Sequence, residues 1–161
     1  MQMSLGNSST ALQDGNTSWN AAALPAIGEW NANMAPVRFA PARKSSGRLK
    51  SNYGKNAVVF SSDVFGQSFG SGVLAITYYW SDGSNDITEA DVLFNTAQPF
   101  DSYRGDLQFN SQGKAIADIR RVFLHELGHA LGLNHPDQAN QHVDAVMNSV
   151  ISDTYLLTAD D

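Results

Sequence analysis

Residues 125–135 read His-Glu-Leu-Gly-His-Ala-Leu-Gly-Leu-Asn-His and hold three of the four histidines of the chain. On a helix, His125 and His129 project from the same face, with Cβ atoms roughly 5–6 Å apart. Both imidazoles can then reach one metal ion at about 2.0–2.1 Å. Gly132 permits a positive φ and is typical of a helix end, so the chain can turn and bring His135 to the same ion. Three nitrogen ligands leave one position open, which indicates a catalytic zinc.

Two further residues belong to this pattern. Glu126 follows the first histidine, about 100° further around the helix, where it can take a proton from a water that the metal activates. Met147 predicts either a core side chain that fills a gap or a tight turn beneath the metal, and these interpretations are compatible. The remaining histidine, His142, is predicted to lie on the surface. A bare HExxH occurs by chance, but the longer pattern makes chance a poor explanation.

Composition fits one domain over residues 1–161, with 42% apolar residues, 16% charged residues and a net charge of −6. This acidic balance gives no electrostatic reason to bind nucleic acid. The stretch from Arg43 to Lys50, interrupted by Ser and Gly, predicts a solvated loop. Cysteine is absent, so disulfides and thiolate ligands are excluded. No apolar run approaches the roughly 18 residues of a membrane helix, and no signal peptide is visible.

Periodicity predicts strands before a long, late helix, which indicates the α+β class. Helical spacing begins at Ser18, with Thr17 or Ser18 as the cap, although Pro25 conflicts with an uninterrupted helix. Residues 41–55 and 99–113 read as irregular. The predicted strands cover residues 1–5, 37–40, 56–60, 73–80 and 87–95, and the predicted long helix covers residues 114–131.

The sequence resembles the metzincins and, among them, the matrixins. The histidine motif and Met147 carry the resemblance, and Gly72–Ala75, Ile87–Asn95 and Leu157–Asp161 extend it over nearly the whole chain. It implies a zincin-like fold: a twisted mixed sheet, an N-terminal helix, a long active-site helix and a C-terminal subdomain with a Met-turn. It also implies a secreted zinc endopeptidase with Glu126 as general base. Both ends of the chain look cut, because the first residues read as the middle of a strand and the C-terminal helix has only begun at residue 161.

The resemblance also implies how substrates bind. Protein or peptide substrates would lie extended along the edge strand, against Gly72, Val73, Leu74 and Ala75, and residues 148–157 would form the wall of an apolar specificity pocket. A pro-segment or a protein inhibitor would be further partners. One zinc is expected, because Gln108 stands where matrixins with a second, structural zinc have a histidine.

Asp91 and Asp106 match calcium-ligand positions of the family, and their hard carboxylate oxygens suit Ca²⁺. The alternative is that they are ordinary carboxylates of a turn and a strand edge, and the sequence leaves both interpretations open.

Two other functions stay open. Pro136 after the third histidine also occurs in serralysins, but those peptidases carry a tyrosine where this chain has Ser149. An inactive zinc-binding module on the same fold is the other alternative. The intact Glu126 argues against it, because an inactive site has little use for a general base.

Overall fold

The computed structural model describes residues 1–35, 37–42 and 52–161, so the predicted loop from Arg43 to Lys50 lies outside the described residues. Its main sheet has the strand order β1-β2-β4-β3. Strands β1, β2 and β4 are parallel, and β3 runs antiparallel to β4 at the edge of the sheet. The strands are β1 (Gln2–Met3), β2 (Ala57–Ser61), β3 (Ala75–Ser81) and β4 (Ile87–Asn95). The mixed sheet predicted from the sequence is confirmed.

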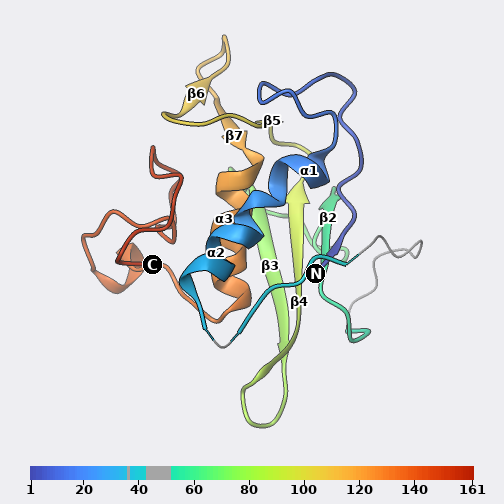
Figure 1. Cartoon of the computed structure of the whole chain (residues 1–161), viewed down its shortest axis with the longest axis vertical. Helices are drawn as coiled ribbons and strands as arrows, with labels where there is room; N and C mark the ends of the chain where they lie inside the picture. Colours follow the sequence, from blue (N-terminus) through green and yellow to red (C-terminus); the bar gives the residue numbers. More distant parts are fainter. Residues whose placement is uncertain (36, 43–51) are drawn as a thin grey trace.

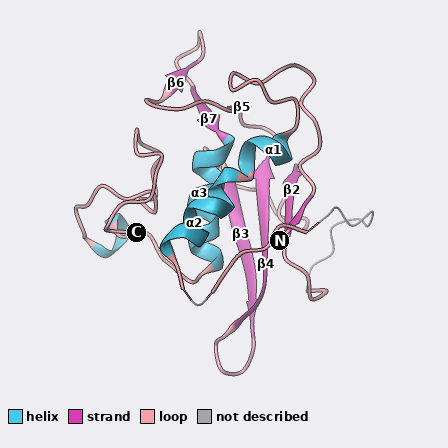
Figure 2. Ribbon diagram, in the orientation of Figure 1, coloured by secondary structure: helices cyan, strands magenta, loops and turns pink. Residues whose placement is uncertain are grey.

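Helices α1 (Trp19–Ala23), α2 (Pro25–Asn33) and α3 (Ile119–Ala130) lie together on one face of this sheet (Figures 1 and 2). Between the sheet and the helices lies the main core, which includes the fully buried Val92, Phe94 and Phe123. On the opposite face, Val64 and Phe69 pack against Leu93. The active-site helix is therefore supported along its length by packed side chains.

The predicted N-terminal helix is two helices, because Pro25 occupies the first position of α2 and cannot continue the hydrogen-bond ladder of α1. Leu24 joins the two helices, and its N–H still bonds to Asn20 O at 3.0 Å. Ser18 is the cap, since its side chain accepts from the N–H of Ala21. The conflict noted at the proline is thus resolved by a break in the helix.

The start predicted for the long helix is wrong. Residues Ala115–Asp118 form strand β7, which pairs with β5 (Phe100–Asp101) and β6 (Gln108–Phe109) inside the segment predicted to be irregular. The helix begins only at Ile119, because the carboxylate of Asp118 accepts from the N–H groups of Arg120 and Arg121. Capping and strand pairing together override the helical spacing of the preceding apolar residues.

One smaller prediction is also wrong. Residues 37–40 form no strand, because the side chain of Asn31 bonds to both the N–H and the C=O of Phe39, each at 2.8 Å. Residues 157–161, the predicted entry to a C-terminal helix, lie in turns, and that helix stays a prediction. There, the carboxylate of Asp161 accepts from the N–H of Met147 at 2.9 Å and of Thr158 at 2.8 Å. This contact ties the last described segment to the turn at Met147.

Candidate active site

Helix α3 ends in a left-handed turn that returns the chain toward its own last turn. Gly132 has φ +91°, the N–H of Leu133 bonds to Gly128 O at 3.0 Å, and the N–H of Gly132 bonds to His129 O at 2.9 Å. This pair of bonds is the Schellman motif, in which glycine relieves the steric cost of the left-handed conformation. The turn brings His135 back beside the helix, as the sequence predicts.

The three histidines of the motif converge on one point. The Nε2 atom of His129 lies 3.0 Å from that of His125 and 3.0 Å from that of His135, and the third separation is 3.2 Å. Nitrogen ligands about 2.0–2.1 Å from a tetrahedral zinc lie roughly 3.3 Å from one another. These three side chains are therefore spaced as zinc ligands are.

Backbone carbonyls fix the tautomers of two of these rings. Nδ1 of His125 lies 2.8 Å from Val146 O, and Nδ1 of His129 lies 2.8 Å from Leu133 O. A carbonyl oxygen only accepts, so each Nδ1 carries the proton and each Nε2 keeps its lone pair. Burial lowers the pKa of His125 and of His129, which favours the neutral imidazole that a metal requires. Lone pairs that converge in this way fit a cation such as zinc.

Glu126 places a buried carboxylate beside the histidines. Its side chain is 4% exposed, and its Oε2 accepts a hydrogen bond from Thr77 Oγ1 at 2.7 Å. Burial raises the pKa of Glu126, and the bond from the Thr77 hydroxyl opposes that rise. A raised pKa brings a carboxylate closer to the range in which general bases work at neutral pH.

Met147 lies in a turn in which the N–H of Asn148 bonds to Ala145 O. The methionine is 2% exposed and packs against the backbone of α3 at Gly128. A Cβ built on Gly128 would lie 2.2 Å from Met147 Sδ, so only glycine leaves room for this contact. The turn at Met147 therefore packs against α3 at Gly128, the residue directly before His129.

A cleft of about 760 Å³ opens onto the histidines and Glu126. Gly72, Val73, Leu74 and Ala75 all line it, as do Asn148–Ser152 and Thr154 from the predicted pocket wall. The cleft therefore brings together the predicted metal ligands, the predicted general base and the edge of the sheet at β3.

In a comparison with known protein families, the family model described as matrixin matches residues 4–161. The chain belongs to the matrixin family. Membership supports a metallopeptidase with a metzincin fold, and the three converging histidines fit its catalytic zinc. A search of curated protein sequences found no match. Within the part of this matrixin that the structure describes, no helix is long and apolar enough to cross a membrane.

Arg121 is a cleft residue that the sequence analysis missed. Its side chain is buried, its Nη1 and Nη2 donate to Ser152 O and Gly105 O, and its guanidinium lies 5.7 Å from the ring centre of Tyr103 and 5.8 Å from that of Tyr155. The arginine holds the 148–157 wall against the loop at residue 105. Arg121 precedes His125 by one helical turn and so shares its face of α3, a signal that was available in the sequence.

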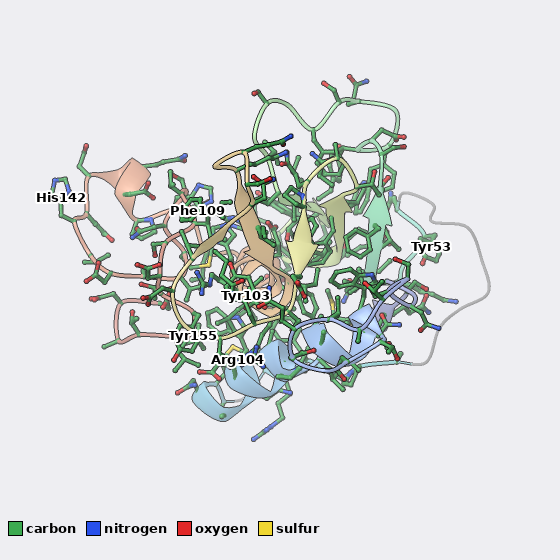
Figure 3. All side chains as sticks on the ribbon, turned by 90° about the horizontal axis from the view of Figure 1, so that it is seen from above. Tyr53, Tyr103, Arg104, Phe109, His142 and Tyr155 are labelled. Atoms are coloured by element: carbon green, nitrogen blue, oxygen red, sulfur yellow. The ribbon has the colours of Figure 1, made fainter. Side chains whose placement is uncertain are left out.

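Two polar residues lie apart from the three converging histidines. His142 is exposed at the periphery of the molecule, as predicted (Figure 3). The amide oxygen of Gln108 accepts from Gln13 Nε2 at 2.8 Å. The expectation of a single zinc stays a prediction.

The structure gives the two predicted calcium ligands different surroundings. Asp91 is fully buried, and its Oδ1 accepts from the N–H of Ala57 at 2.7 Å, whereas Asp106 is exposed on a loop. Among the described residues, only the three histidines form a group of three or more metal-ligating side chains within reach of one ion. The calcium site therefore stays a prediction without structural support.

Burial of Asp91 has a measurable consequence. Desolvation raises its pKa from 3.8 to about 7, and the nearby Glu89 adds to the rise. The folded chain then binds a proton that the unfolded chain has released, so stability falls as pH rises from about 4 through 7. The amide oxygen of Asn in the variant Asp91→Asn can still accept from the N–H of Ala57. We expect the melting temperature of this variant to fall less between pH 5 and pH 8 than the melting temperature of the wild type.

Thermal denaturation of both proteins at the two pH values measures this difference. Asp86→Asn serves as a control, because Asp86 is an exposed carboxylate in the turn between β3 and β4. If the melting temperatures of the wild type and of Asp91→Asn fall by the same amount from pH 5 to pH 8, the prediction is wrong.

Proposed function

We propose that this matrixin is a zinc-dependent endopeptidase that hydrolyses peptide bonds in extended protein substrates. The observation that supports the proposal is the position of a buried carboxylate, Glu126, beside three imidazoles whose Nε2 atoms lie 3.0–3.2 Å apart in an open cleft. His125, His129 and His135 would hold the zinc. When bound, the zinc supplies a Lewis acid and lowers the pKa of water toward about 7.

Glu126 carries the proton transfers of the proposed reaction. Its carboxylate takes a proton from the attacking water as the water oxygen bonds to the carbonyl carbon of the substrate. As the C–N bond breaks, Glu126 returns this proton to the leaving amine nitrogen, so the carboxylate is regenerated. No covalent bond between the enzyme and the acyl group is required.

The proposed substrate-binding site lies along the edge of the sheet at β3. Among the described strands, β3 pairs with β4 alone, and the segment Gly72–Ala75 that leads into β3 lines the cleft. An extended peptide can add to such an edge through backbone hydrogen bonds, which gives affinity without demanding one sequence. A pro-segment or a protein inhibitor would bind at the same edge of the sheet.

We also propose that the protein acts outside the cell, because matrixins are generally extracellular. The match to matrixins and the Ser149 at the tyrosine position both favour a matrixin over a serralysin-like enzyme. An inactive zinc-binding module is the remaining alternative, and an activity assay separates it from a peptidase.

The proposal predicts turnover of casein or a fluorogenic peptide that stops when a chelator removes the zinc and returns when zinc is added back. His135→Ala should lose both stoichiometric zinc and activity, because two imidazoles bind far less tightly than three. His142→Ala is the matched control and should keep both, since His142 is exposed away from the cleft. Zinc bound at one equivalent without any turnover would support the inactive module instead.

A further inference from the structure

The side chain of Thr77 reaches from the sheet to the active-site helix. Thr77 lies in β3 opposite Val92, whose side chain is buried in the core between sheet and helices. Cross-strand partners share one face of a sheet, so Thr77 also faces α3. Its Oγ1 lies 2.7 Å from Glu126 Oε2 and 2.9 Å from Glu126 O. A hydroxyl with one proton thus has two acceptors on the same residue.

The two acceptors differ in strength. A hydrogen bond to a carboxylate oxygen is charge-assisted and stronger than a bond to a neutral carbonyl. The distance to Oε2 is also the shorter of the two, so the hydroxyl donates to the carboxylate of Glu126.

The other carboxylate oxygen of Glu126, Oε1, remains available to accept a proton. No hydrogen bond reaches it within the described part of the chain, and it is not among the buried side-chain atoms that lack a partner. An oxygen that is neither bonded nor buried is accessible, and Glu126 lines the cleft. By occupying Oε2, Thr77 directs Oε1 toward the cleft.

We infer that Thr77 is a positioning residue for the general base: its hydroxyl holds the Glu126 carboxylate in the orientation that presents Oε1 to the attacking water. This inference rests on the proposed function. Thr77 lies outside the histidine motif, since its contact with Glu126 joins β3 to α3 across 49 residues of sequence. It acts on the proton transfer and leaves the three zinc ligands untouched.

Thr77→Val tests the inference, because valine keeps the branched shape and removes the hydroxyl. With a fluorogenic peptide, we expect kcat to fall about 10- to 100-fold, which is the effect of losing a hydrogen bond to a charged group. KM and zinc content should change little. Thr77→Ser should restore most of kcat, since serine returns the hydroxyl.

The control is Thr88→Val, which removes an exposed threonine hydroxyl from the adjacent strand, where it bonds to Trp80 O. It should leave kcat unchanged. An active wild type with an unchanged kcat in Thr77→Val, or Thr77→Ser as impaired as Thr77→Val, overturns the role of Thr77 alone. A wild type that binds zinc and has no turnover overturns the proposed function.

Discussion

Replacing Glu126 by glutamine will lower kcat about 10²- to 10⁴-fold, the usual contribution of a general acid–base group, while zinc content and KM change little. Glutamine has the same shape and can still accept from the Thr77 hydroxyl at 2.7 Å through its amide oxygen. Its amide cannot take a proton from water near neutral pH. The loss should therefore appear in turnover and leave metal binding intact, because the histidine ligands are unchanged.

Steady-state kinetics with a fluorogenic peptide, together with metal analysis of the same samples, measures both parts of this prediction. Glu29→Gln is a suitable control, because it also removes a helical carboxylate near α3, where Glu29 pairs with Arg120 at 3.2 Å. That variant should keep its kcat. Near-normal turnover in Glu126→Gln would show that another group accepts the proton.

The convergence of the three histidines could be predicted from sequence because their geometry is local. The spacing of His125 and His129 on a helix and the glycine after it specify where the third histidine returns, with no knowledge of the sheet. The contact between Thr77 and Glu126 could not be predicted in this way. It depends on how β3 packs against α3, and residue spacing alone does not give that information.

Errors in the element boundaries have a related cause. Apolar residues before Asp118 continue the helical period, yet the strand pairs of β7 and the Asp118 cap are stronger local determinants. At residues 37–40, the side chain of Asn31 satisfies the backbone of Phe39 and no strand partner is needed. Periodicity reports which residues are apolar, whereas the boundary depends on where the backbone hydrogen bonds go.

Gly128 is a residue of the motif whose substitution should cost stability through overpacking. Replacing it by alanine would place a Cβ 2.2 Å from Met147 Sδ and 3.3 Å from Trp30 Cζ2. Met147 is buried, and Trp30 is held by its indole N–H, which bonds to Leu124 O at 2.8 Å. Overpacking of this kind costs about 1–3 kcal/mol, which exceeds the gain of about 1 kcal/mol that alanine brings to a helix.

We expect Gly128→Ala to lower the free energy of unfolding and to weaken zinc binding, because a displaced Met147 moves Val146 O away from the Nδ1 of His125. Denaturant titration and competition with a zinc chelator measure the two effects. Gly28→Ala in α2 is the matched control: its Cβ would meet nothing within 4 Å, so helix propensity alone should stabilise it. In a double-mutant cycle, Gly128→Ala should cost less in a Met147→Ala background, because the clashing sulfur is gone. Equal costs in both backgrounds would show that Met147 does not set the size limit at Gly128.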